Sequence, residues 1–279
     1  MPEPGADGPP TLAGAWTLDP WLLLPLLLFA ALHALGLWRL RRQRARPGPV
    51  TLLAAAAGWT TLALALVWPF DAYGEWSLAA HMTQHMLLMA AVPPLLFAGA
   101  LSEALLQLFP PGLLRAAGGG LRAARGGGAS LPLLAATLLQ AAVMVLWHWP
   151  PWMQAALASD PLHYLMHASF LGAGMGFWWC LQQSLRAPRL GYGGGALAVL
   201  STMMPMGLVG ALLTFAPRPL YPHYLGRSEL LGLAPLADQQ LAGLVMWVPA
   251  TLPYLIGGLW LLRAWLRRLE ARQRAWPAR

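Results

Sequence analysis

Two pairs of histidines, each with three residues between its members, are the strongest chemical feature of this sequence. The pairs are His81 with His85 and His163 with His167, and a fifth histidine, His148, ends another apolar stretch. Residues four apart share one helix face, with Cβ atoms about 5–6 Å apart, which suits two imidazoles on one metal ion. Two such pairs, together with His148, predict one metal site. A single histidine near a membrane surface more often hydrogen-bonds to water or headgroups, because imidazole is amphipathic.

The residue types around these histidines favour copper. Imidazole suits zinc, copper and iron, whereas thioether sulfur selects Cu(I), and methionines such as Met82, Met86, Met144 and Met166 lie close in sequence. Methionine also fills gaps in apolar cores, so no single methionine is assigned as a ligand. The apolar stretches offer one carboxylate, that of Asp238 at the outer start of the last stretch, which argues against a magnesium or calcium site.

Three further features leave alternatives open. Asp238 is expected either to orient a ligand histidine from outside the ligand set or to cap the helix that it begins. His33 is expected to be a packing residue, and His223 a loop residue that could still help a substrate to enter. A haem held by one histidine from each pair is the main competitor, although spacing of one helical turn favours a compact site over stacked haems.

The elements that position these residues are membrane-spanning helices. The 279 residues are 58% hydrophobic and 10% charged, whereas a soluble domain carries about a quarter charged residues. A span needs about 20 mostly apolar residues. Seven segments meet this requirement: Trp21–Leu40, Val50–Trp68, Leu78–Leu101, Leu131–Trp149, Pro161–Gln183, Ala196–Ala216 and Gln239–Leu262. The sequence therefore predicts an all-α integral membrane bundle of seven transmembrane helices.

The arginines predict how the bundle is oriented. Cytoplasmic loops collect basic residues, and 16 of the 18 arginines fall on one side of the seven segments, leaving Arg218 and Arg227 on the other. We therefore expect an extracytoplasmic leader over residues 1–19, a transmembrane domain over 20–262 and a basic cytoplasmic tail over 263–279. This topology places six of the seven histidines on the outer side.

The same distribution excludes other functions. The net charge of +8 reflects orientation in a membrane, so no nucleic-acid partner is expected. The single cysteine, Cys180, excludes an internal disulfide framework, and no catalytic constellation is present, so we expect a protein that is not an enzyme. Gly172 and Gly176 predict a small-residue face for close helix packing.

Three motifs resemble those of a known family. HMTQHMLLMAAVPPLL (His81–Leu96), HYLMH (His163–His167) and DQQLAGLVMW (Asp238–Trp247) are similar to the CtaG family, seven-span bacterial membrane proteins associated with assembly of caa3-type cytochrome c oxidase. Their histidines and Asp238 fall on the motif positions. The resemblance implies a role in maturing an oxidase in the bacterial plasma (inner) membrane, with oxidase subunits and an extracytoplasmic copper carrier as partners.

The leading hypothesis is therefore an assembly factor that binds copper at an outer-facing histidine cluster and helps to deliver it to the oxidase. A haem-binding membrane electron carrier or reductase is the first alternative. A copper transport or resistance permease is the second, and it ranks lower because the inner halves of the segments contain few polar residues.

Overall fold

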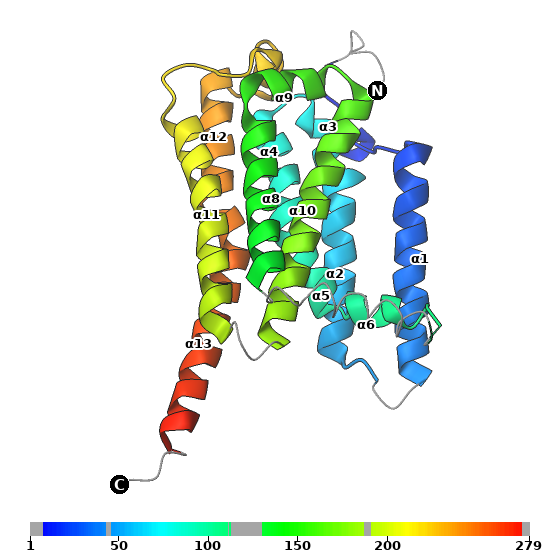
Figure 1. Ribbon diagram of the computed structural model, residues 1–279. Helices are drawn as coiled ribbons and strands as arrows, with labels where there is room; N and C mark the ends of the chain where they lie inside the picture. Colours follow the sequence, from blue (N-terminus) through cyan, green and yellow to red (C-terminus); the bar gives the residue numbers. More distant parts are fainter. Residues whose placement is uncertain (1–7, 43–45, 111, 113–129, 187–190, 275–279) are drawn as a thin grey trace.

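The computed structural model describes residues 8–42, 46–110, 112, 130–186 and 191–274, and within these ranges the protein is all-helical, without a strand. The long helices run side by side as an upright bundle (Figure 1). One end of this bundle carries the short helices α3 (Phe70–Gly74) and α9 (Pro150–Leu157) and is uppermost in Figure 1. We call this the upper end.

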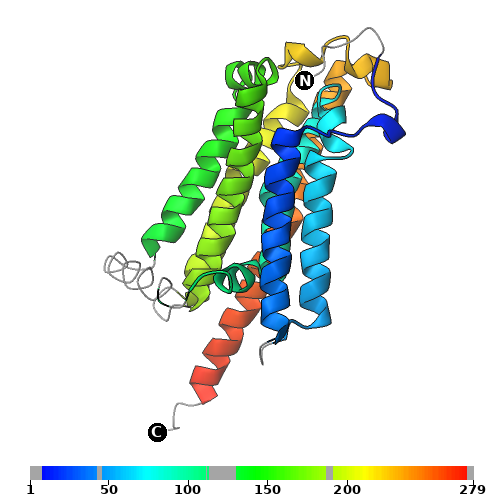
Figure 2. The ribbon, with the colours of Figure 1, turned by 90° about the vertical axis from the view of Figure 1, so that its right-hand side faces the viewer.

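All seven predicted segments are helical. They correspond, in chain order, to α1 (Pro20–Arg42), α2 (Pro49–Leu66), α4 (Leu78–Met86) continued by the π-helical turn η2 (Leu87–Ala91) and α5 (Val92–Ala98), α8 (Ser130–His148), α10 (Asp160–Arg186), α11 (Gly191–Phe215), and α12 (Pro235–Trp247) continued by η6 (Pro249–Thr251) and α13 (Leu252–Arg274). The short helix α6 (Leu101–Leu106) lies across the bundle near its lower end and packs against α1 (Figure 2).

By length and composition, four described helices could each cross a membrane: Pro20–Arg42, Pro49–Gly74, Tyr192–Phe215 and Pro235–Ala271. A fifth candidate is the pair Pro132–His148 and Pro150–Leu157, which is bent by 75°. The third predicted segment is divided into helices that are each too short, and α10 carries histidines and glutamines that lower its hydropathy.

The described arginines separate by ends of the bundle. Arg218 and Arg227 lie in the connection between α11 and α12 at the upper end, whereas the C-terminal parts of α1, α10 and α13 carry most of the others at the lower end (Figure 1). Six of the counted arginines lie outside the described residues: Arg44, Arg115, Arg122, Arg125, Arg189 and Arg279.

The third segment is interrupted because two consecutive prolines remove backbone donors. Pro93 has no N–H to donate to the carbonyl of Met89, four residues earlier. The hydroxyl of the fully buried Tyr254, at the start of α13, donates to that carbonyl instead, at 3.3 Å. Gln140 of α8 in turn donates to the Tyr254 oxygen, so this break is stabilised from two other helices.

Asp238 of α12 fixes the upper end of α4. Its carboxylate accepts hydrogen bonds from Ser77 Oγ at 2.6 Å, from the Leu78 amide at 2.6 Å and from the Ala79 amide at 3.2 Å. Ser77 is itself the N-cap of α4, because its hydroxyl accepts from the Ala80 amide. Two side chains thus bind the amide groups that a helix start leaves without intrahelical partners.

Close packing of α10 depends on Gly174 rather than on the two predicted glycines. A Cβ at Gly174 would lie 2.6 Å from the Met89 carbonyl oxygen, whereas a Cβ at Gly172 or Gly176 would have no neighbouring atom of the described residues within 4 Å. The predicted Gly172–Gly176 contact face is therefore wrong for this structure. The Met89 carbonyl, at the proline break, lies instead against the face of α10 that carries Gly174.

This contact gives a first prediction. Gly174→Ala forces an overlap with Met89 and is expected to lower the free energy of unfolding by about 1–3 kcal/mol. Gly172→Ala is the matched control on the same helix, and it should leave stability unchanged or raise it, because alanine favours a helix by up to about 1 kcal/mol over glycine. Thermal unfolding of the detergent-solubilised variants measures both. Equal losses for the two variants would contradict the packing described here.

The cap on α4 gives a second prediction. Asp238→Ala should cost about 1–3 kcal/mol of stability, because it leaves buried amide groups unpaired. Ser77→Ala should cost less, since Asp238 still reaches the Leu78 and Ala79 amides. In a double-mutant cycle the two losses should be coupled by at least about 0.5 kcal/mol. Additive losses would show that the two side chains act independently.

Candidate metal centre

Five buried histidines from three helices meet near the upper end of the bundle. They are the five ligands predicted from the sequence: His81 and His85 on α4, His148 at the end of α8, and His163 and His167 on α10. Their side chains are between 0% and 6% exposed. Ring centroids of contacting pairs lie from 4.2 Å apart, for His81 and His85, to 6.0 Å, for His85 and His148.

Three of these histidines form a compact group of nitrogen atoms. One ligand nitrogen from each of His81, His163 and His167 lies within 4.8 Å of the other two. The Nε2 atoms of His163 and His167 are 3.1 Å apart. Two nitrogens bound at about 2.0–2.1 Å to one tetrahedral ion lie about 3.3 Å apart. The His163 and His167 pair is close to this separation, and the His81 nitrogen lies within 4.8 Å of both.

Several buried imidazole nitrogens have no hydrogen-bond partner among the described residues. They are both nitrogens of His81, both nitrogens of His85, and Nδ1 of His163. A buried polar atom without a partner costs about 1–3 kcal/mol, so such atoms need an explanation when several occur together. A metal ion would fit one nitrogen of each ring, because it would bind the lone pair there and leave the N–H of the other nitrogen unaffected.

His148 approaches the same cluster with a sulfur atom beside it. Its Nδ1 lies 2.6 Å from the Met144 carbonyl oxygen, and its Nε2 lies 3.1 Å from Sδ of Met82. Met82 follows His81 on α4 and is fully buried. The cluster therefore presents imidazole nitrogens together with one thioether.

Asp238 is placed differently from either sequence expectation. In the part of the chain that the structure describes, its hydrogen bonds go to Ser77 and the first amides of α4, and not to an imidazole. Nor does it cap its own helix, whose N-cap residue is Ala234. Its contribution to the cluster is indirect, because it holds the start of the helix that carries His81 and His85.

The two remaining histidines differ from each other. His33 is the packing residue that was expected, because its Nδ1 accepts from Trp59 and its Nε2 donates to the Gly99 carbonyl. His223 lies in the upper loop and is half-buried, and its Nε2 has no hydrogen-bond partner among the described residues. Burial and the nearby charge of Arg227 lower the pKa of His223 to about 4, against a backbone hydrogen bond to Glu75. It is therefore neutral at pH 7.

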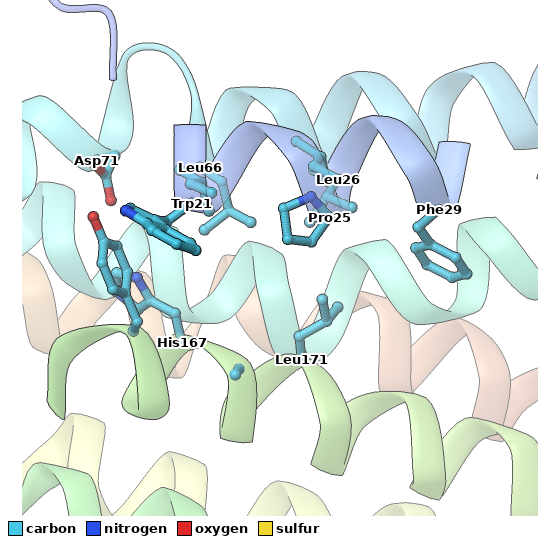
Figure 3. A pocket seen from close by; sticks show the side chains of 12 residues that line it. Trp21, Pro25, Leu26, Phe29, Leu66, Asp71, His167 and Leu171 are labelled. Atoms are coloured by element: carbon cyan, nitrogen blue, oxygen red, sulfur yellow. The ribbon is translucent and has the colours of Figure 1, made fainter. Parts of the chain in front are cut away.

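An apolar pocket of about 410 Å³ borders the cluster between α1, α2 and α10. Asp71 and His167 lie at one end, and Pro25, Phe29 and Leu171 continue along its length (Figure 3). The Asp71 carboxylate accepts hydrogen bonds from Thr17 and Gln84.

This polar group of Asp71, Thr17 and Gln84 was not predicted from the sequence, although Gln84 lies between the two histidines of the first pair. That position, inside a helix segment otherwise rich in apolar residues, was the available signal.

The comparisons with known proteins agree with the motifs. The family model described as cytochrome c oxidase caa3 assembly factor matches residues 31–268, which include all five clustered histidines and Asp238. Comparison with curated proteins and with solved structures gives no significant match. The match covers most of the chain, and the chain therefore belongs to the family of caa3-type cytochrome c oxidase assembly factors.

Proposed function

We propose that this protein binds copper at the five-histidine cluster and helps to deliver it to the cytochrome c oxidase whose assembly the family serves. The observation that carries the proposal is the convergence of the His81, His163 and His167 nitrogens within 4.8 Å, in a buried site. His85 and His148 extend this group, so that the cluster offers more donors than one ion requires. A surplus of donors suits a protein that passes its metal on.

Copper is favoured by the chemistry of the donors. The group with convergent ligand atoms contains imidazoles and no carboxylate, and a thioether contacts one of its neighbours. Magnesium and calcium require oxygen ligands, whereas a mixed nitrogen and sulfur set suits Cu(I). The copper is cargo in this proposal, and the role is one of binding and transfer without a catalytic step.

We place the chain in the bacterial plasma membrane as seven spans, with the N-terminus outside. Two of the seven proposed spans are not among the apolar candidates: the divided segment of α4, η2 and α5, and the polar helix α10. We count both as spans because they run within the bundle beside the apolar helices. Polar side chains are tolerated there because they face the interior of the bundle. The arginine-rich lower end then faces the cytoplasm, and the histidine cluster lies near the outer surface.

This orientation places the cluster where the expected partners are. Oxidase subunits and an extracytoplasmic copper carrier would meet the protein at the upper end, beneath which the histidines are buried. The half-buried, neutral His223 in the upper loop supplies one further imidazole on that side.

Copper retention tests the proposal. Purified protein loaded with Cu(I) under anaerobic conditions and then desalted should retain copper. A variant with His81, His85, His163 and His167 all replaced by alanine should retain none above background. Because that variant removes four core side chains, the single variants His163→Gln and His167→Gln should be measured too, and each should lose at least tenfold in affinity.

His33→Gln is the matched control, since it changes a buried histidine whose two nitrogens are already hydrogen-bonded within the protein. It should retain copper as the parent protein does. Metal analysis and an absorption spectrum of the same sample complete the test. Copper retention that is equal in the parent and the four-histidine variant, or a Soret band from haem, would overturn the proposal.

Cysteine labelling tests the orientation. In a Cys180→Ser background, Glu229→Cys in the upper loop should react with a membrane-impermeant maleimide in intact spheroplasts. Ala271→Cys, near the end of α13, should react only after permeabilisation. Both positions are exposed, so access to the reagent depends on the side of the membrane. The reverse labelling pattern would show that the N-terminus is inside.

A further inference from the structure

The proton on His148 is assigned by its hydrogen bond. Its Nδ1 lies 2.6 Å from the carbonyl oxygen of Met144, and a carbonyl can only accept. Nδ1 therefore carries the proton. In a neutral imidazole the other nitrogen, Nε2, then holds a lone pair and has no hydrogen to donate.

The atom facing that lone pair also lacks a hydrogen. His148 Nε2 lies 3.1 Å from Sδ of Met82, and a thioether sulfur is a weak acceptor only. The lone pairs of His148 Nε2 and Met82 Sδ thus face each other. Both residues are buried, with His148 6% exposed and Met82 0% exposed. Such a pair is not a hydrogen bond, and it is the arrangement that two ligands of one cation adopt.

His85 supplies the third donor and connects this pair to the histidine group. On α4, His85 lies three residues after Met82 and four after His81, so it shares a helix face with both. Its ring centroid is 6.0 Å from that of His148, 4.2 Å from that of His81 and 5.3 Å from that of His167. Neither of its nitrogens has a hydrogen-bond partner among the described residues.

From this geometry we infer that His148, Met82 and His85 form a second, thioether-containing Cu(I) position beside the His81, His163 and His167 group. The inference rests on the proposed function and adds to it that the cluster holds two ions with different ligands. The first position has three imidazole nitrogens, and the second has two nitrogens and one sulfur.

The shared position of His85 defines how an ion moves between the two. The His85 ring borders both groups. Its imidazole can therefore bind an ion at the first position and then at the second, so that the ion moves between them without leaving the protein. Each step is a ligand exchange on Cu(I), in which one metal–nitrogen bond breaks as another metal–ligand bond forms. No change in oxidation state and no further reactant are needed.

Cu(I) stoichiometry and sulfur coordination test this inference. Purified protein in detergent, titrated anaerobically with Cu(I) against a competing chelator, should bind two equivalents. Met82→Leu and His148→Gln should each bind one. X-ray absorption of the fully loaded parent protein should show a copper–sulfur contribution that Met82→Leu lacks. Met206→Leu is the matched control, because Met206 is equally buried but lies on α11, and it should behave as the parent protein does.

The possible failures separate the two proposals. A parent protein that binds one equivalent with nitrogen ligands alone, with Met82→Leu indistinguishable from it, overturns the second position and leaves the proposed function intact. A parent protein that binds no Cu(I) overturns both. Loss of the copper–sulfur contribution in Met206→Leu together with its retention in Met82→Leu would assign the sulfur elsewhere and overturn this inference alone.

Discussion

Five imidazole rings are buried against one another, and the rest of this structure must hold them in place. A neutral imidazole has one N–H and one lone pair, and each costs free energy when buried without a partner. His148 Nδ1 donates to the Met144 carbonyl, and the Nε2 atoms of His163 and His167 contact each other. The ring nitrogens of His81 and His85 have no hydrogen-bond partner among the described residues. The surrounding helices must therefore be held firmly enough to keep these rings together.

That support comes from polar contacts that join distant parts of the chain. Asp238 binds the start of α4 across 160 residues of sequence, and Tyr254 satisfies the Met89 carbonyl that the proline break leaves free. Both partners lie on the α12–α13 segment, and both act on the segment that contains His81 and His85. The stretch from Asp238 to Tyr254 is thus hydrogen-bonded to the stretch from Ser77 to Met89 at two separate points.

Sequence patterns predicted the parts of this structure that depend on local spacing. The four-residue spacing indicated that each histidine pair shares a helix face, and the structure brings both pairs and His148 together. The partner of Asp238 could not be predicted, because a carboxylate in a first helical turn can cap its own helix or another. The face of α10 that packs at Gly174 depends on where the proline break displaces the Met89 carbonyl, which spacing alone does not reveal.

The apolar surroundings also bear on the charge of the ion that the proposed function assigns to the cluster. The cost of moving an ion from water into a medium of low dielectric scales with the square of its charge, so a monovalent ion costs about a quarter as much as a divalent ion of equal size. The carboxylates of the partly buried Asp71 and the buried Asp238 already accept hydrogen bonds from Thr17, Gln84, Ser77 and backbone amides. Neutral imidazoles and a thioether, in a site without a ligating carboxylate, therefore favour Cu(I) over a divalent ion. In the proposed function, these neutral ligands would supply no opposite charge, so a partner with an anionic ligand would compete well for the ion.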